Sequence, residues 1–393
     1  MKKALKYLML VPAMATVAMA AQAGDNLNRG AASAGSSFAF GLFQDAVSYD
    51  GSDIVFISPL SASMALSMTA NGAEEATLDE MLSVLGQDAS IKDLNEYNRS
   101  VMDFLASGPV GIELNVANSI WVSDLFPVRS RFCKTAVKYY DALVSNLDFS
   151  DPASPSVINS WCSENTNGRI GKMIESIDPA TQMYLLNALY FKGMWSCPFD
   201  AARTREDIFH GNNRSSKVEF MHNTADFAYY TGPEGSVLEL PYGNGSFVMD
   251  IFLPAEGTSA EEFVSGLDSE ALSTLTGLLQ TDRIKVTIPK FKAEYETSLI
   301  ATLQRLGMRT AFTPAADFSG IAREPLMISE VKQKTFIEVN EKGSEAAAVT
   351  SVGIMRTSLA PDPFEFKADR PFVFLIRGRE SGPVLFMGIV RNL

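Results

Sequence analysis

The sequence predicts a single α+β domain, and three observations favour that class. Apolar residues recur at helical spacing through much of the first half of the chain, whereas strand-like alternation dominates the second half. No repeat, low-complexity linker or break in composition divides the chain. Hydrophobic residues make up 46% of the 393 residues, which indicates a globular protein with a large core. The net charge of −13 argues against nucleic acid and anionic membranes as partners.

We expect the first 23 residues to be a signal peptide. Basic residues up to Lys6 precede an apolar run over residues 8–20, and small residues follow, so that cleavage is expected after Ala23 or Ala20. A membrane anchor is the alternative interpretation, but the run is short for a bilayer. The predicted mature domain therefore covers residues 24–393, and its expected location is secreted or periplasmic.

Six helices and one strand are predicted in the first half. Residues 58–73 begin with Ser-Pro, a helix-start signal, and are apolar almost all round, so this helix should be buried. Residues 112–123 alternate as a strand. The other predicted helices cover residues 31–49, 76–85, 91–106, 129–143 and 154–177.

The second half is predicted to be mainly strands. Residues 182–195 are nearly continuously apolar, which suits a strand that is buried on both faces. Residues 237–254 have the pattern of a hairpin that turns between Gly243 and Gly245. Residues 283–299 are predicted as a strand that passes into a short helix ending near Leu306. The remaining predicted strands cover residues 334–343, 364–376 and 383–393.

Residue types typical of an active site are sparse. The two histidines, His210 and His222, belong to no H-E-x-x-H pattern, and there is no G-x-S-x-G motif or P-loop. The widely spaced Cys133, Cys162 and Cys197 indicate neither a disulfide framework nor a metal site, although one pair could bridge. A hydrolase with a dispersed triad stays open as an alternative. We expect no enzymatic activity, no metal and no cofactor.

One stretch near the C-terminus, EKGSEAAAVTSVGIMRTSLA at residues 341–360, is unusual for a surface loop. It contains no proline, and Glu345 is the only charge between Ser344 and Met355. Surface loops normally contain Pro, Asp, Asn or Lys. A segment that enters a sheet must instead lack proline and alternate with period two. The even-numbered residues are all uncharged: Ser344, Ala346, Ala348, Thr350, Val352 and Ile354.

Seven motifs follow one another along the chain: FISPLSASMALSM from Phe56, NALYFKGMW from Asn187, IPKFKAEY from Ile288, ADFSGI from Ala316, FIEVNEKGSEAAAVT from Phe336, ADRPFVFLI from Ala368 and VLFMGIVRN from Val384. Together they resemble the serpin family over essentially the whole mature chain. The resemblance implies the serpin fold, with three β-sheets, eight to nine helices and an exposed reactive-centre loop at about residues 341–362. It also implies suicide inhibition, in which a protease cleaves the loop, the loop inserts into the main sheet, and the acyl-enzyme is trapped.

The resemblance also assigns roles to single residues. The hinge that enters the sheet first would be Glu341, Gly343, Ser344, Glu345, Ala346, Ala347 and Ala348. Lys290 would pair with Glu341 near Trp195 in the breach, although two solvated charges are the plainer interpretation. The shutter beneath the parting strands would contain Ser58, Ser61, Asn187 and Gln333. Ser58 is equally well explained as a helix cap. Gln333 stands where the family often has His, which puts in doubt any pH dependence tied to that His.

The reactive bond is expected near the end of the loop. Counting Glu341 as the first of seventeen residues, as in the family, places it at Thr357–Ser358, which suits elastase-like or subtilisin-like proteases. A loop one residue shorter gives Arg356–Thr357, which suits trypsin-like enzymes, and Met355 would be a third, weaker register. The expected partner is an extracellular serine protease in a 1:1 covalent complex with a monomer. A non-inhibitory serpin, acting as a binding protein or chaperone, is the main alternative.

Overall fold

The computed structural model describes residues 29–86, 89–107, 111–344, 363–380 and 382–393. Among these residues there are nine α-helices: α2 (Arg29–Tyr49), α3 (Pro59–Ala70), α4 (Glu75–Leu85), α5 (Ile91–Ala106), α6 (Ser130–Tyr140), α7 (Ser154–Asn165), α8 (Ala260–Ser265), α9 (Ser269–Gly277) and α10 (Ile300–Leu306). No described helix is long and apolar enough to cross a membrane.

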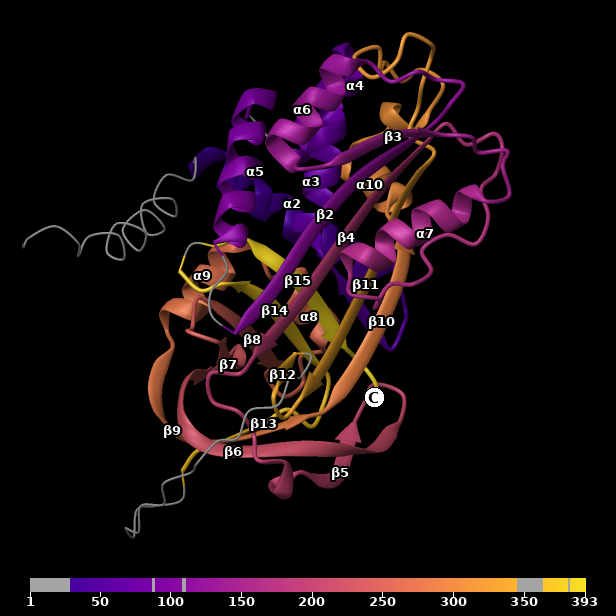
Figure 1. Cartoon of the computed structure of the whole chain (residues 1–393). Helices are drawn as coiled ribbons and strands as arrows, with labels where there is room; N and C mark the ends of the chain where they lie inside the picture. Colours follow the sequence, from indigo (N-terminus) through magenta and orange to yellow (C-terminus); the bar gives the residue numbers. More distant parts are fainter. Residues whose placement is uncertain (1–28, 87–88, 108–110, 345–362, 381) are drawn as a thin grey trace, which may run out of the picture.

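A six-stranded sheet forms the long face of the molecule in Figure 1. Its strands, in spatial order, are β10 (Phe291–Ser298), β11 (Glu330–Asn340), β12 (Gly343–Ser344), β4 (Met183–Met194), β2 (Ile112–Ser123) and β3 (Leu143–Leu147). Helix α7 packs on the outward face of this sheet, against β2 and β4. Helix α3 packs against β2 and β4 and also against β15 of the second sheet, so it lies between the two sheets.

The second sheet has nine strands, and its longest strand, β6, joins two groups of strands. Its strands, in spatial order, are β1 (Ile54–Ile57), β15 (Val384–Val390), β14 (Phe372–Gly378), β8 (Phe247–Pro254), β7 (Gly235–Tyr242), β6 (Ser215–Gly232), β9 (Gln280–Pro289) and β13 (Glu365–Lys367), with β5 (Arg205–His210) beside β6. Because β6 is 18 residues long and pairs with β5, β7 and β9, two of the three expected sheets form one hydrogen-bonded sheet here.

The buried helix α3 illustrates how the local sequence sets an element. Ser58 caps it, because the Ser61 N–H donates to Ser58 Oγ at 3.3 Å, and Pro59 occupies the first turn. All twelve residues of α3 are buried, as predicted from a segment that is apolar almost all round. The cap therefore holds the start of a helix that both sheets contact.

Several predicted elements have different bounds in the structure. The strand predicted over residues 283–299 is divided into β9 and β10, which belong to different sheets. The helix predicted over residues 129–143 ends at Tyr140, because Asp141 adopts a left-handed conformation (φ 46°) and β3 follows. The helix predicted over residues 154–177 ends at Asn165 and is followed by two residues with positive φ, Asn167 and Gly168. The strand predicted over residues 364–376 is split into β13 and β14, with Pro371, which has no N–H to donate, just before β14.

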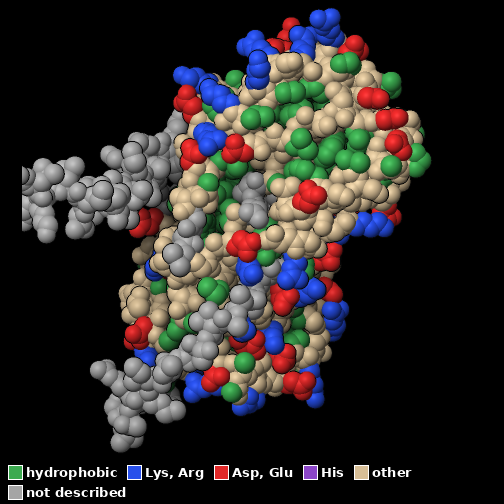
Figure 2. All heavy atoms as spheres, viewed as in Figure 1, with side chains coloured by type: hydrophobic (Ala, Val, Ile, Leu, Met, Phe, Trp, Pro, Cys, Tyr) green, Lys and Arg blue, Asp and Glu red, His purple; other side chains and the backbone are tan. Residues whose placement is uncertain are grey.

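The described ranges contain neither a possible metal-binding cluster nor a disulfide. These ranges contain no group of three His, Cys, Asp or Glu side chains placed to hold a metal ion. Cys133, Cys162 and Cys197 are free thiols, and Cys162 is buried. Acidic and basic side chains are interspersed on the face shown in Figure 2. On that face, the net negative charge does not form one acidic patch.

Candidate functional site

The site is the seam between strands β11 and β4, which run parallel in the centre of the six-stranded sheet. At one end, Glu330–Gln333 of β11 pair directly with Tyr184–Asn187 of β4. At the other end, β12 lies between the two strands and is antiparallel to both. Between these places, none of the described residues of β11 and β4 pair with each other. The seam is therefore closed at one end and already entered by two residues at the other (Figure 1).

The two residues of β12 make ladder contacts on both sides. Ser344 pairs with Val339 of β11 and with Gly193 of β4, and Gly343 pairs with Asn340 and Met194. A central strand has neighbours on both edges, which an ordinary surface loop lacks. The chain thus begins a new central strand directly before the unusual stretch.

Glycine is required at the point of entry. Gly343 has φ 150°, and a Cβ atom there would lie 2.0 Å from the carbonyl oxygen of Gly193. Gly193 is restricted in turn, because a Cβ on it would lie 2.6 Å from the ring of Tyr242. Two backbones therefore pass each other at a distance that only glycine allows.

A buried hydroxyl pair anchors the second entered residue. Ser344 is 1% exposed, and its Oγ lies 2.6 Å from the hydroxyl of Tyr242, with which it shares a hydrogen bond. The ring of Tyr242 stacks on Trp195, with centroids 4.4 Å apart. Burial raises the pKa of Tyr242, so its hydroxyl stays protonated at neutral pH.

Trp195 also holds the turn that joins β11 to β12. Its indole N–H donates to the carbonyl of Asn340 and its backbone N–H donates to the carbonyl of Lys342, both at 2.9 Å. The Phe199 N–H donates to the carbonyl of Glu341 at 2.8 Å. Consecutive carbonyls of the turn are therefore satisfied by one neighbouring segment.

The expected ion pair at the turn is present. Lys290 Nζ lies 3.3 Å from Glu341 Oε1 and 3.0 Å from Glu219 Oε2. The hydroxyl of Thr204 donates to Glu341 at 2.7 Å. Burial alone would raise the pKa of Glu341, but the bond from Thr204 and the charge of Lys290 together hold it below its usual value. Glu341 is thus a partly buried, ionised anchor rather than a freely solvated charge.

Gln333 and Ser58 connect the closed end of the seam to helix α3. The Ser58 N–H donates to Gln333 Oε1 at 2.9 Å, and Gln333 Nε2 donates to the Ser58 carbonyl at 2.8 Å. Ser58 Oγ also donates to the carbonyl of Leu385 at 2.7 Å while it accepts from Ser61. Ser58 therefore combines both of its expected roles, as a helix cap and as a polar contact beneath the strands.

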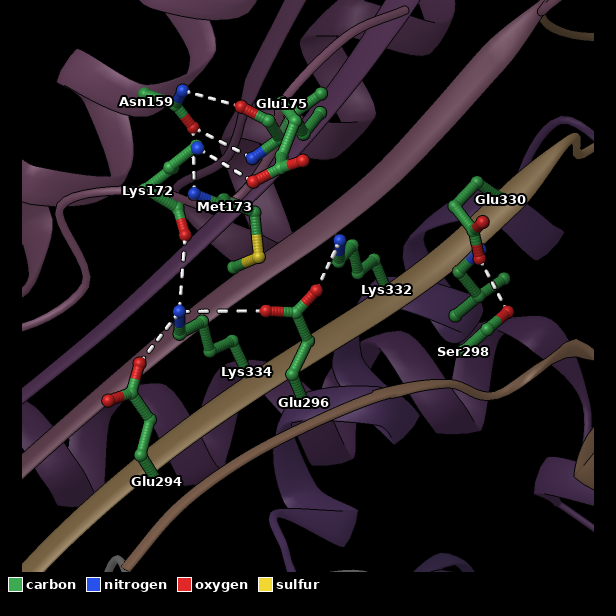
Figure 3. A network of polar contacts seen from close by, with 12 residues as sticks. Asn159, Lys172, Met173, Glu175, Glu294, Glu296, Ser298, Glu330, Lys332 and Lys334 are labelled. Carbon is green, nitrogen blue, oxygen red and sulfur yellow. Dashed lines mark hydrogen bonds and ion pairs between the residues drawn. The ribbon is translucent and has the colours of Figure 1, made fainter.

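The outward face of β11 carries a second polar network (Figure 3). Lys334 pairs with Glu294 at 2.7 Å and donates to the carbonyl of Lys172 at 3.3 Å, while Lys332 pairs with Glu296. Lys172 lies in the segment that follows α7. The neighbouring Met173 is buried in the cluster that contains Tyr184 and Leu186 of β4. This segment therefore spans the seam from β4 to β11 on its outward side.

Several predicted site residues lie outside the described residues. These are Glu345, Ala346, Ala347, Ala348, Arg356, Thr357 and Ser358, together with the side chain of Asn187, whose backbone pairs with Gln333. The proposed signal peptide also lies outside them. Sequence reasoning missed Tyr242 and Thr204. Only the position of Tyr242 at the end of a predicted hairpin strand hinted at a role.

The two histidines lie in separate places and form no catalytic arrangement with each other. His222 Nδ1 is 3.0 Å from the hydroxyl of Thr287, which donates to Glu365 at 2.9 Å. His210 Nδ1 is 3.4 Å from Ser215 Oγ at the β5–β6 hairpin. Burial lowers the pKa of His222, which keeps it neutral at pH 7.

Comparison with known proteins identifies this architecture. The family model described as serpin (serine protease inhibitor) matches residues 33–393. The chain is a member of the serpin family. As a serpin, it belongs to a family whose general function is protease inhibition rather than catalysis, and its general partners are proteases.

Relatives of this serpin include a coagulation inhibitor, a thermophilic serpin and a thyroxine-binding globulin. It is 36% identical to intracellular coagulation inhibitor 2 of Tachypleus tridentatus, over 88% of this chain and 86% of that protein. It is also similar to the native thermophilic serpin tengpin, with 36% identity, a TM-score of 0.85, and coverage of 92% and 94% of the two chains. Thyroxine-binding globulin, solved with thyroxine, has 29% identity, a TM-score of 0.83, and coverage of 92% and 98%.

Proposed function

We propose that this serpin is a suicide inhibitor of serine proteases, and that its residues 341–362 form the reactive-centre loop. The observation that carries the proposal is β12, which lies as a two-residue strand between β11 and β4 at the open end of the seam. Serpin loop insertion is an established form of strand addition to a sheet. The two residues of β12 support this proposal, because a longer inserted strand would continue their position, direction and neighbours.

Continuing the register of β12 predicts where each loop residue would lie. Ala346 would face Ile337 and Phe191, Thr350 would face Gln333 and Asn187, and Ile354 would reach the level of Met183 at the start of β4. Once the paired end of the seam opens, a strand from Ser344 to Ile354 would extend along the whole seam and end just before the expected reactive bond.

The alternation of the loop fits this register. Alternate residues of β11 are buried, including Val339, and Ser344 opposite Val339 is buried as well. Even-numbered loop residues would continue this buried layer, and all of them up to Ile354 are uncharged. Glu345, by the same alternation, would face outward.

Insertion of the loop would break a short stretch of strand pairing and form a longer one. The strand pairing of Glu330–Gln333 with Tyr184–Asn187 must open, together with the contacts of Gln333 that brace it. In return the loop would gain backbone hydrogen bonds along the whole seam. At about 1 kcal/mol each, this amounts to roughly 10 kcal/mol, comparable to the stability of a whole domain. Such an energy release can distort a protease that is bound covalently to the loop.

The proposed target is an extracellular serine protease, held in a 1:1 covalent complex with a monomeric inhibitor. Cleavage at Thr357–Ser358 suits an elastase-like or subtilisin-like enzyme, and cleavage at Arg356–Thr357 suits a trypsin-like one. Export through the N-terminal signal peptide would bring the inhibitor to such enzymes. A protease would bind the loop through its uncharged and Arg side chains. The acidic net charge of the chain is therefore compatible with this role.

The test is incubation with elastase-like, subtilisin-like and trypsin-like proteases, followed by a denaturing gel. An inhibitor gives an SDS-resistant band near the sum of the masses of the inhibitor and the protease. Mass spectrometry should show that the released C-terminal peptide begins at Ser358 or at Thr357. Cleavage should also raise the melting temperature of the nicked protein by at least about 10 °C, because the inserted strand adds stability. Clean cleavage with no covalent band for any protease, and an unchanged melting temperature, would favour a non-inhibitory binding protein or chaperone.

A further inference from the structure

A hollow on the surface lies between helices α8 and α9, away from the seam between β11 and β4. It has a volume of about 490 Å³, which suits a small organic molecule. The turn between β6 and β7, at Glu234, and the loop before α8, at Thr258, complete its wall. None of its lining residues belongs to β4, β11 or β12. We call it the α8–α9 hollow (the two helices are labelled in Figure 1).

The floor of the α8–α9 hollow is apolar. It is formed by Phe263, Leu267, Leu275 and Leu278. The ring of Phe263 packs on Phe252 of β8, with centroids 5.6 Å apart, so this part of the floor is fixed to the sheet. Leu278 is 44% exposed. Leu278 therefore leaves part of the apolar lining open to a ligand.

The rim of the hollow is acidic. Its charged lining residues are Glu234, Glu262, Asp268 and Glu270, and no Lys, Arg or His lines it. None of these four carboxylates forms an ion pair with a described residue. By contrast, Glu261, which precedes Glu262 on α8, pairs with Arg391 at 2.6 Å. A concave site lined by one sign of charge concentrates the field, so this rim attracts a cation.

We propose that the α8–α9 hollow binds a small organic cation with an apolar, preferably aromatic, body. The apolar part would cover Phe263, Leu275 and Leu278, and the ammonium group would lie among the rim carboxylates. The floor by itself would accept a neutral molecule, and the rim by itself would accept an inorganic cation or a polyamine. Both features occur in one cavity, which selects a molecule with both parts. This binding activity is independent of protease inhibition.

The test compares three probes on the whole protein by isothermal titration calorimetry at low salt. Tryptamine has an aromatic body and an ammonium group, tryptophol has the same ring with a hydroxyl, and spermidine has charge without an aromatic body. We expect tryptamine to bind at least tenfold more tightly than either of the others. Its advantage over tryptophol should shrink as salt screens the rim. Equal affinities for tryptamine and tryptophol, or no binding of tryptamine at millimolar concentration, would overturn the proposal.

Variants of exposed residues locate the binding. The double change Glu262→Gln and Glu270→Gln should weaken tryptamine several-fold and leave tryptophol unchanged, whereas Leu278→Gln should weaken both. Glu256→Gln is the matched control, because Glu256 is exposed nearby but does not line the hollow. If the double variant binds tryptamine as the parent does, the cation lies elsewhere and the assignment is wrong.

Discussion

Gln333 of β11 and Ser58 at the start of α3 are 275 residues apart in the sequence and exchange two hydrogen bonds, at 2.9 and 2.8 Å. Gln333 is 3% exposed, so neither water nor another side chain readily replaces these bonds. The amide both accepts and donates, and it does so without carrying a charge. The closed end of the seam is therefore braced by a pair that is neutral at every physiological pH.

Replacing Gln333 with Leu should destabilise the native state by about 2–4 kcal/mol, because the N–H and carbonyl of Ser58 both lose their buried partner. The variant should also lose inhibitory activity faster on warming, since the strands part more easily. Thermal unfolding and timed activity assays check both effects. Lys332→Ala, on the outward face of the same strand, is the control and should cost less than about 1 kcal/mol. Equal stabilities of the two variants would contradict the bracing role.

Glu341 should make the stability of this serpin depend on acid. Its pKa in the folded protein lies below the ordinary value of 4.5, so its contribution is fully present above pH 4.5 and is lost as the pH falls through the folded value. Glu341→Gln should therefore be destabilised by about 1–2 kcal/mol at pH 7. This gap from the parent should narrow below pH 4.5 in unfolding experiments. Glu338→Gln is the control, and a gap that stays constant with pH would refute the ion-pair explanation.

The hydroxyls of Tyr242 and Ser344 should be energetically coupled. Tyr242→Phe leaves Ser344 Oγ without this partner, and Ser344→Ala does the same to Tyr242, so each change alone costs roughly 1–2 kcal/mol. The double variant should recover about 1 kcal/mol relative to the sum of the two single changes, which a double-mutant cycle measures by denaturant unfolding. Tyr230→Phe, which removes an exposed hydroxyl bonded to Glu234 at 3.4 Å, should change little. Strict additivity would show that the hinge is not anchored by this bond.

Ala346→Pro should convert the inhibitor into a substrate. Proline removes a backbone donor from a strand that needs partners on both edges, so insertion stops after two residues and the protease hydrolyses the acyl-enzyme. The gel should show a cleaved chain and free protease in place of the covalent band. Ala360→Pro, beyond both candidate bonds, should still trap the protease. If Ala346→Pro traps it as efficiently, the loop does not insert as a strand.

The spacing of apolar residues correctly predicted several helices and strands in which buried positions recur at regular intervals. Strand β2 and helix α5 have the predicted bounds, and the buried helix α3 has its predicted cap. Two missed helix ends lie beside non-glycine residues that adopt positive φ, Asp141 and Asn167, whereas the split between β13 and β14 lies at Pro371. Such conformations depend on tertiary packing rather than on local propensity.

The candidate site was only partly accessible to sequence reasoning. The pair of Glu341 with Lys290 was predicted because it follows from the resemblance to serpins. The partnership of Ser344 with Tyr242 joins residues 102 positions apart on different elements. No periodic pattern connects a hairpin tyrosine with a loop serine, so this contact is visible only in three dimensions.

The close passage of Gly343 and Gly193 fixes where the loop turns. Since a Cβ at either position would collide with its surroundings, the chain has no neighbouring residue that could serve as an equivalent pivot. The position of each later loop residue in the strand would therefore depend on its number of residues from Gly343. Adding a single residue after Ser344 would shift the bond presented to a protease and exchange the two faces of the inserted strand, so that charged Glu345 would point inward. For the proposed inhibitor, the number of residues after Ser344 would therefore set both the bond that a protease meets and the face that each inserted residue turns inward.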